Sequence, residues 1–259
     1  AIYTPNDISQ IMASWAIQDK TDRILDLGVG EGAFVFAAYD RLIQLGVSSE
    51  KAQCLIYGSE IDLDTYQSFN DLAQSRDLFF PHVEHTDFFQ YRTNTEILYD
   101  VIIGNPPYVR RYNIRNVDAI RKVVFESSEM QPSDIRNLSD LYVYFILHSA
   151  SKLKPGGRLC VITADSWLNV GYGKVLREYL TTFFEIRQIT IVDYPLFENA
   201  EVKAVIIQAY KNKPKLGHCV NFAHVTKPTA LFNGALENGI RETDSDFRIE
   251  QSDLGSEKP

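Results

Sequence analysis

Cysteine is scarce in this sequence, with three among 259 residues. Cys54, Cys160 and Cys219 lie far apart, and no Cys-x-x-Cys pair occurs, so neither a disulfide framework nor a structural zinc site is expected. We predict that all three are small buried apolar residues in a reducing compartment. The five histidines show no ligand-like spacing either, and we predict no metal site.

Long apolar runs are also missing. No run approaches the ~18 residues that a membrane-spanning helix needs. The chain does not open with a charged segment followed by an apolar one, as secretion signals do. We therefore expect a cytoplasmic protein without a membrane partner. Because the chain starts at Ala1 and not at methionine, we also expect it to be a piece of a longer protein.

An excess of positive charge is the third absence. The chain has 26 Lys and Arg against 34 Asp and Glu, a net charge of −8, whereas nucleic-acid-binding surfaces are normally basic. Net charge alone therefore argues against a nucleic-acid partner. What is present is an ordinary globular composition with 45% hydrophobic residues, and a length that predicts one full domain and part of a second.

Short β-type runs alternate with amphipathic helical stretches over about four fifths of the chain. This alternation predicts parallel βαβ units in a doubly wound α/β sheet with helices on both faces. The expected strands are residues 23–27, 54–61, 82–86, 100–104, 158–163, 186–193 and 203–211. The expected helices are residues 34–45, 64–75, 141–152 and 175–183.

The last two expected strands are joined by nine residues, too few for a crossover helix. The seventh strand should therefore run antiparallel to the sixth, in an otherwise mostly parallel seven-stranded sheet. After Pro214 no clear periodicity remains. We predict a domain over residues 1–214, followed by a linker or the truncated start of another module over residues 215–259.

A glycine-rich segment, Asp26-Leu27-Gly28-Val29-Gly30-Glu31-Gly32, follows the first expected strand and precedes a helix. Glycines here let the backbone approach a ligand closely, at the end of the strand where α/β folds bind cofactors. A dinucleotide fingerprint would need glycine at Ala33, and Glu31 would lie poorly beside a pyrophosphate. Acidic residues suit a cofactor with sulfonium and ammonium groups, and we predict S-adenosylmethionine.

Acidic residues also follow the next two expected strands. Glu60, beside Ile61, is placed to accept hydrogen bonds from ribose hydroxyls, as the equivalent acid does in dinucleotide folds. Asp87 could accept a hydrogen bond from an adenine amino group, with Phe88 packed on the ring. Together with the glycine-rich segment, these residues predict an adenosine pocket.

The tetrapeptide Asn105-Pro106-Pro107-Tyr108 directly follows the fourth expected strand. Consecutive prolines have a fixed φ and no amide proton, so they hold the segment rigid and leave carbonyl oxygens as acceptors. If the side-chain oxygen of Asn105 and the carbonyl of Pro106 accept the two protons of an amino group on a planar ring, the nitrogen lone pair can attack a methyl donor. Tyr108 offers a flat face on which that substrate can stack.

In the order and character of these motifs, the sequence resembles the gamma-class amino methyltransferases, which are DNA adenine-N6 enzymes of bacterial restriction–modification systems. The resemblance covers about residues 3–210. It implies a Rossmann-like class I methyltransferase fold and methyl transfer from S-adenosylmethionine to an adenine flipped out of double-stranded DNA. It also implies a fused or separate target-recognition or endonuclease module as a partner.

The resemblance assigns roles to particular residues. The run Tyr3-Thr4-Pro5 is similar to the segment that contacts the methionine end of the cofactor, and Phe145 lies in a segment like the helix that flanks it. Phe197 resembles the aromatic residue that packs edge-on against the flipped base. The other implied cofactor residues are Asp26, Gly28, Gly30, Glu31, Glu60, Ile61, Asp87, Phe88 and Asn105, and the other implied catalytic residues are Asn105, Pro106 and Tyr108.

Basic residues gather after the tetrapeptide. Residues 109–122 contain five Arg or Lys against one Asp. We predict that Arg110, Arg111 and Arg115 contact DNA phosphates near the flipped base. A solvated helix face is the alternative interpretation of this stretch.

Three other functions stay open. A glutamine-N5 methyltransferase that modifies release factors, or an RNA amino-group methyltransferase, would use the same tetrapeptide. The release-factor enzymes resemble chains with a helical N-terminal domain, whereas only 22 residues precede the first expected strand here. A cofactor-binding scaffold without activity is the third alternative, and the intact tetrapeptide argues against it.

Overall fold

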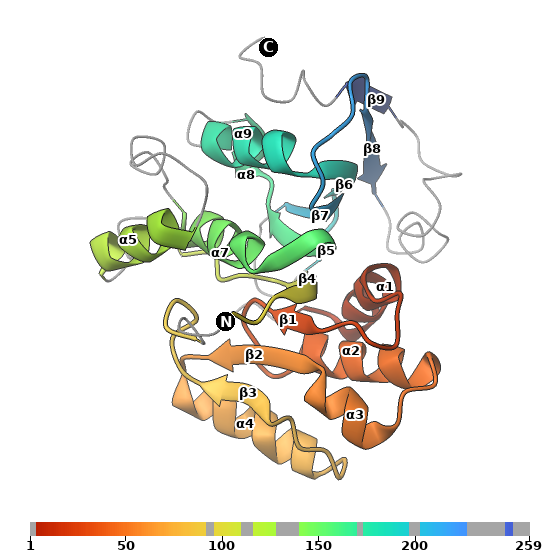
Figure 1. The fold of residues 1–259 in the computed structure, drawn as a ribbon, viewed down its shortest axis with the longest axis vertical. Helices are drawn as coiled ribbons and strands as arrows, with labels where there is room; N and C mark the ends of the chain where they lie inside the picture. Colours follow the sequence, from red (N-terminus) through yellow and green to blue (C-terminus); the bar gives the residue numbers. More distant parts are fainter. Residues whose placement is uncertain are drawn as a thin grey trace.

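A nine-stranded sheet runs through the part of the chain that the structure describes (Figure 1). This computed structural model describes residues 4–91, 96–109, 116–127, 140–169, 173–196 and 203–226, and the backbone of residues 247–250. The strand order is β3-β2-β1-β4-β5-β7-β6-β8-β9. The strands are β1 (Ile24–Asp26), β2 (Ile56–Glu60), β3 (His82–His85), β4 (Tyr99–Gly104), β5 (Leu153–Ala164), β6 (Glu185–Val192), β7 (Ala204–Tyr210), β8 (Cys219–Val225) and β9 (Phe247–Glu250).

The strands β3, β2, β1, β4 and β5 pair parallel with one another, and β7 interrupts this pattern. β7 lies between β5 and β6 and pairs antiparallel with both, so that Ile207 is opposite Val161 on one side and Ile189 on the other. The short connection from β6 leaves no room for a crossover helix, and the predicted antiparallel strand is confirmed. β8 pairs parallel with β6, and β9 pairs antiparallel with β8.

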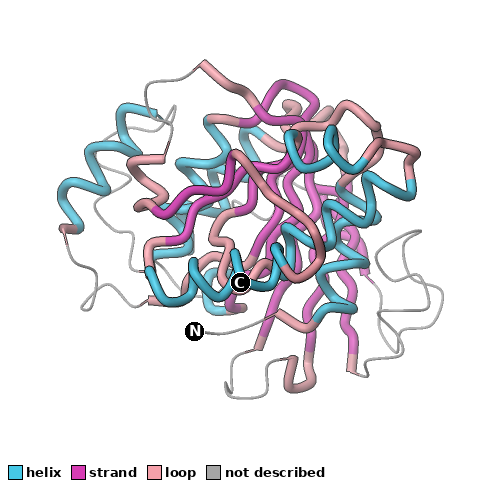
Figure 2. The backbone as a smooth tube through the Cα atoms, turned by 90° about the horizontal axis from the view of Figure 1, so that it is seen from below, coloured by secondary structure: helices cyan, strands magenta, loops and turns pink. Residues whose placement is uncertain are grey.

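Helices cover both faces of the sheet (Figure 2). Because side chains alternate along a strand, Ile102 of β4 belongs to one hydrophobic core, while Val101 and Ile103 belong to the other. The helices on the side of Val101 are α1 (Asn6–Ala16), α2 (Ala33–Gln44), α3 (Ser49–Cys54) and α4 (Leu63–Gln74). Those on the side of Ile102 are α5 (Val117–Ser127), α7 (Leu141–Ser151), α8 (Ser166–Asn169) and α9 (Lys174–Phe183).

The helix α7 has no polar face, and its surroundings explain why. Residues 142–150 are all buried, because the helix packs against β5, α5 and α9. A helix enclosed on several sides needs apolar residues all round. Among the helices that α7 contacts is α5, whose position is therefore fixed by packing against α7.

A buried ion pair links the start of β1 to β5. Arg158 Nη2 lies 2.5 Å from Asp22 Oδ1, and the two side chains are 10% and 5% exposed. The other carboxylate oxygen of Asp22 accepts the backbone N–H groups of Gln18 and Asp19, both at 2.9 Å. Both charges are thus paired and hydrogen-bonded, which compensates for their removal from water.

The structure confirms the predicted α/β class and all seven expected strands, and it adds elements that the pattern did not indicate. Helices α1, α3, α5 and α8 are additional, and β8 and β9 extend the sheet beyond β6. Residues 215–226, expected in a linker or a truncated module, thus contribute β8 to the same sheet. The division of the chain at residue 214 stays a prediction.

The prediction for the cysteines was right for one of the three. Cys160 is buried in the middle of β5, whereas Cys54 and Cys219 are exposed. Cys54 ends α3 and Cys219 begins β8, and the ends of these elements face solvent. In the described ranges no helix is long and apolar enough to cross a bilayer.

Candidate active site

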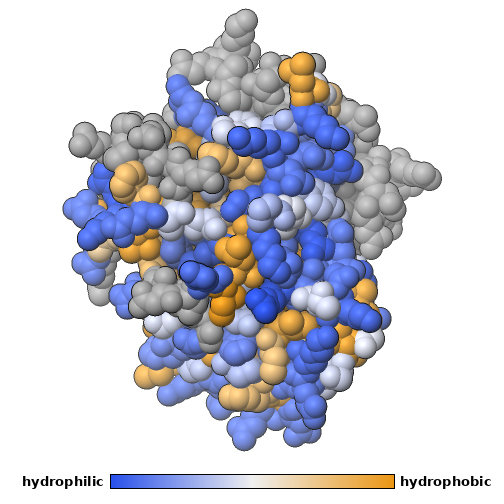
Figure 3. Space-filling model, in the orientation of Figure 1, coloured by the Kyte–Doolittle hydropathy of each residue, from blue (hydrophilic) through white to orange (hydrophobic). Residues whose placement is uncertain are grey.

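A cavity of about 840 Å³ lies at the carboxyl ends of β1, β2, β3 and β4. Its volume falls in the upper part of the ~300–1,000 Å³ range of small-molecule sites, and doubly wound sheets bind ligands at this end of their strands. The lining comes from the glycine-rich segment, from the ends of the other three strands, and from α5 and α7. Figure 3 shows apolar side chains gathered near α5 and α7 within a mainly hydrophilic surface.

The glycine-rich segment contributes its backbone to the cavity wall. A Cβ atom added at Gly28 or Gly30 would meet no heavy atom within 4 Å, and both residues line the cavity. Side chains here would therefore occupy the space of a ligand, and glycine keeps the backbone accessible. The N–H of Gly30 donates to Glu60 Oε2 at 2.9 Å, which joins this segment to the end of β2.

Asp26 ends β1 immediately before this segment and is 1% exposed. Its Oδ1 accepts the Gly28 N–H at 3.1 Å, and its Oδ2 has no hydrogen-bond partner among the described residues. Burial raises the pKa of Asp26 to about 7, opposed by the hydrogen bond from Gly28 and assisted by the negative charge of Glu60. At neutral pH this carboxyl group is therefore divided between its charged and neutral forms.

Two backbone N–H groups hold the carboxylate of Glu60 in place. Oε2 accepts from Gly30, and Oε1 accepts the Asp62 N–H at 3.0 Å. Each carboxylate oxygen can accept more than one hydrogen bond, so Glu60 retains the capacity to bind two hydroxyl groups of a ligand. Asp62 in turn caps α4, where its Oδ1 accepts the Thr65 N–H at 2.9 Å.

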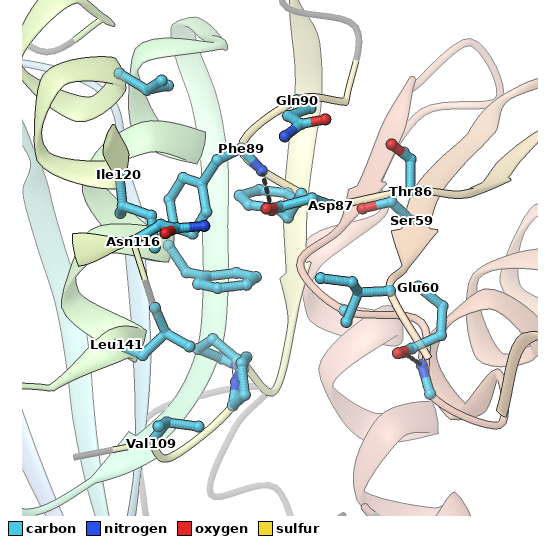
Figure 4. Close-up of a pocket in the computed structure, with 18 of the residues that line it drawn as sticks. Ser59, Glu60, Thr86, Asp87, Phe89, Gln90, Val109, Asn116, Ile120 and Leu141 are labelled. Carbon is cyan, nitrogen blue, oxygen red and sulfur yellow. Dashed lines mark hydrogen bonds between the residues drawn. The ribbon is translucent and has the colours of Figure 1, made fainter. Parts of the chain in front are cut away.

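A fixed carboxyl group and aromatic rings meet after β3. Asp87 Oδ1 accepts the Phe89 N–H at 3.0 Å (Figure 4). Phe88 is buried and stacks on Phe145 of α7, with ring centres 4.6 Å apart and planes 8° from parallel. Ile61, which is 67% exposed, adds apolar surface to the same cavity. Apolar surfaces beside an acceptor are what an amino-substituted planar ring requires.

The tetrapeptide begins where β4 passes close to β1. At Gly104 φ is 150°, and a Cβ atom would lie 2.9 Å from the backbone nitrogen of Leu27, so only glycine fits. Asn105 Nδ2 donates to Thr4 Oγ1 at 3.1 Å. Asn105 Oδ1 is buried and has no hydrogen-bond partner in the described part of the chain. An unpaired buried acceptor costs roughly 1–3 kcal/mol. A ligand that donates a hydrogen bond to this atom removes that cost and thereby gains affinity.

Pro106, Pro107 and Tyr108 continue the lining from Asn105. The ring of Tyr108 packs edge to face against Tyr142, with ring centres 6.1 Å apart. Burial raises the pKa of Tyr108, so its hydroxyl group stays neutral. The segment thus presents a rigid backbone and an uncharged aromatic ring beside the unpaired acceptor of Asn105.

A comparison with known protein families identifies the source of this arrangement. The sequence profile of the Eco57I restriction-modification methylases matches residues 38–197, more than half of the chain, including Glu60, Asp87 and the tetrapeptide. The chain belongs to the Eco57I restriction-modification methylase family. The expected membership of a restriction–modification methyltransferase family is confirmed.

Curated relatives of this Eco57I-family chain are considerably longer. Type II methyltransferase M.BstVI of Geobacillus stearothermophilus is 28% identical over 190 residues, which cover 64% of this chain and 33% of that protein. Type II methyltransferase M.HincII of Haemophilus influenzae is 26% identical over 212 residues, which cover 82% of this chain and 37% of that protein. The chain thus spans about a third of the length of these relatives.

Solved structures share the fold at low sequence identity. A type I restriction-modification system methyltransferase subunit from Streptococcus thermophilus has a TM-score of 0.74 at 15% identity, over 97% of this chain and 56% of that one. A Listeria monocytogenes protein assigned to the class I S-adenosylmethionine-dependent methyltransferases has a TM-score of 0.69 at 19% identity, over 91% of this chain and 71% of that one. The predicted class I methyltransferase fold is confirmed.

The cavity of this Eco57I-family member gathers nine of the predicted site residues, and Asp26 is not among them. Those in its lining are Gly28, Gly30, Glu60, Ile61, Asp87, Phe88, Asn105, Pro106 and Tyr108. Thr4 joins the site through Asn105, whereas Pro5 precedes α1 and Glu31 is exposed, and neither lines the cavity. Outside the described residues lie Tyr3, Phe197, Arg110, Arg111 and Arg115. The roles of all these residues stay predictions.

The wall formed by α5 was not predicted from the sequence. Asn116, Ala119, Ile120 and Val123 line the cavity beside Phe145. Their spacing of three, four and seven residues is that of one helix face, which the sequence could have shown. The basic residues of the same stretch directed the interpretation toward DNA and solvent instead.

Proposed function

We propose that this chain is the catalytic part of a site-specific DNA methyltransferase that transfers a methyl group from S-adenosylmethionine to the N6 amino group of an adenine, in a bacterial restriction–modification system. Membership of the Eco57I family supports a restriction–modification methyltransferase. The observation that carries the finer proposal is the buried, unpaired Oδ1 of Asn105, held beside two prolines in the cavity lining.

The residues of the cavity fit S-adenosylmethionine. Gly28 and Gly30 leave open space beside the backbone, and the fixed carboxylate of Glu60 can accept the ribose hydroxyls. Asp87 and Ile61 would hold the adenine ring by a hydrogen bond and an apolar contact. The acidic residues of this region also favour a cation. When bound, S-adenosylmethionine supplies an electrophilic methyl group carried by a sulfonium ion.

Asn105 prepares the amino group of the substrate. Its Oδ1 and the carbonyl of Pro106 would accept the two N–H protons, which draws the nitrogen toward tetrahedral geometry and localises its lone pair. Bound S-adenosylmethionine would supply its methyl group to this lone pair and leave as the thioether, and the methylated nitrogen would release one proton to solvent. No strong general base is needed, because that proton becomes acidic only after methylation. Alignment is therefore the main contribution of the protein.

A base within a duplex cannot reach this cavity, so the target adenine would be flipped out at a cost of about a few kcal/mol. Stacking on Tyr108 and Phe197 would offset part of that cost, at roughly 1–3 kcal/mol per base. Arg110, Arg111 and Arg115 would contact neighbouring phosphates. Since the match covers only 33% of the relative M.BstVI, we expect a fused or separate recognition or endonuclease module as a partner.

Methyl incorporation from tritiated S-adenosylmethionine tests the proposal. We expect incorporation into the adenine of double-stranded DNA, with none into RNA or release-factor protein. Asn105→Ala should nearly abolish turnover, with a far smaller effect on the affinity for S-adenosylhomocysteine. Label in RNA, or in a glutamine of the release factor, would show that DNA is not the substrate. Full activity of the variant would refute the role of Asn105.

A further inference from the structure

The helix α5 is fixed against α7 by apolar and polar contacts. Val124 of α5 is fully buried in the same hydrophobic core as the residues of α7, and Ser127 Oγ lies 3.0 Å from His148 Nδ1. Burial lowers the pKa of His148 to about 3, so this ring is neutral over the usual working range of pH. The Leu141 N–H donates to the Val109 carbonyl at 2.9 Å, which joins the two ends of the insertion. These contacts fix the position of α5, which therefore forms an ordered wall of the cavity.

Asn116 is placed at the start of this wall by its backbone. Its φ is 56°, a left-handed value that asparagine tolerates better than most residues. Its carbonyl accepts the N–H groups of Ala119 at 3.0 Å and Ile120 at 3.2 Å, which begins α5. The side chain points into the cavity (Figure 4), and no described residue forms a hydrogen bond with its amide group.

The opposite sides of the cavity carry complementary groups. Figure 4 shows Asn116 and Ile120 on one side, Glu60 on the other, and Asp87 between them. One oxygen of Asp87 is occupied by the Phe89 N–H, which leaves the second oxygen for one N–H of an amino group. A carboxamide carries a donor and an acceptor side by side, and it matches the adenine edge where N7 accepts and N6–H donates.

We propose that α5 forms one wall of the site for the adenine ring of S-adenosylmethionine. Asn116 hydrogen-bonds the N7 and N6–H edge of that ring, and Ile120 contacts it through apolar surface. The inference rests on the proposed cofactor and names two further residues that bind it. It also assigns part of the insertion between the tetrapeptide and α7 to cofactor recognition.

The test pairs one side chain with one ligand atom. Binding of S-adenosylhomocysteine and of its 7-deaza analogue, in which a C–H group replaces N7, is measured by calorimetry for the wild-type chain and for Asn116→Gly. Glycine tolerates the left-handed backbone and removes the side-chain amide together with its Cβ atom. A single hydrogen bond predicts that the wild type binds the analogue roughly 2- to 10-fold more weakly. For Asn116→Gly we expect the two ligands to bind alike.

Three further variants control the measurement. Asn116→Asp keeps a similar shape but offers no donor to N7, so it should no longer bind the ligand with N7 more tightly than the analogue. This variant serves if glycine destabilises the helix. Ile120→Ala should weaken both ligands equally. Lys122→Ala, at a position 76% exposed on the same helix, should change neither affinity.

The outcomes separate the two proposals. Equal binding of the two ligands by the wild type, or an unchanged preference in Asn116→Gly, would overturn the role of Asn116. Unchanged affinities in Ile120→Ala would show that Ile120 of α5 does not contact the bound ligand. Failure of the wild type to bind S-adenosylhomocysteine at all would instead refute the proposed cofactor, on which the inference depends.

Discussion

The carboxyl group of Asp26 makes the stability of this fold depend on pH. Its pKa is about 7 in the folded chain, against the ordinary value of 3.8 for an aspartate that water surrounds, as in the unfolded chain. As pH rises above 3.8, the unfolded chain loses this proton first, so unfolding becomes more favourable until pH 7 is passed. One pH unit corresponds to about 1.4 kcal/mol, and the full cost above pH 7 is therefore about 4 kcal/mol.

Asp26→Asn removes this dependence while keeping the oxygen that accepts the Gly28 N–H. Relative to the wild type, the variant should gain about 2 kcal/mol of unfolding free energy between pH 5.5 and pH 8. Any effect of the amide on packing is the same at both values of pH and cancels in this difference. The sign follows from burial, because only the charged form of the carboxyl group is penalised.

Urea denaturation at pH 5.5, 6.5 and 8 measures the difference directly. Asp71→Asn, at an exposed position of α4, serves as the control, because water surrounds that side chain in the folded and the unfolded chain alike. A stability difference between Asp26→Asn and the wild type that is equal at all three pH values would refute the reasoning. It would mean that the carboxyl group of Asp26 titrates alike in both states.

Two further predictions concern the buried ion pair and the glycine-rich segment. Arg158→Met should lower the unfolding free energy by about 3–5 kcal/mol, because it leaves the charge of Asp22 buried without its partner. Lys154→Met breaks a pair whose lysine side chain is 38% exposed and should cost at most about 1 kcal/mol; equal losses in urea denaturation would contradict this ranking. Gly28→Val should weaken S-adenosylhomocysteine binding about 10-fold by filling the cavity, with little change in melting temperature because the protein leaves room for the side chain. Unchanged affinity by calorimetry would show that no ligand approaches this backbone.

Local sequence determined the strands and the motifs at their ends. Strands such as β4 are buried on both faces, so they are short apolar runs that stand out between polar segments. The short connection before β7 also determined the direction of that strand. Since the carboxyl ends of parallel strands meet at one edge, Glu60, Asp87 and Asn105 could be assigned to one site without coordinates.

The strand β8 could not be predicted from local sequence, because it depends on pairing with β6, which lies further back in the chain. β8 has polar and apolar residues mixed in a segment without strong periodicity, and it becomes a strand because β6 offers an open edge beside it. Likewise Cys54 and Cys219 are exposed because of where α3 ends and β8 begins, which their residue type could not reveal.

The polar side chains at the strand ends could thus be predicted from the sequence alone, whereas the helix that encloses the cavity could be identified only from the tertiary structure. Residue type and spacing are sufficient to place a carboxylate or an asparagine at a strand end. The position of α5 depends on the burial of Val124 and on the hydrogen bond between Ser127 and His148. These partners lie on separate helices and meet only in the folded chain. For that reason Asn116 and Ile120 became visible as cavity residues only in three dimensions.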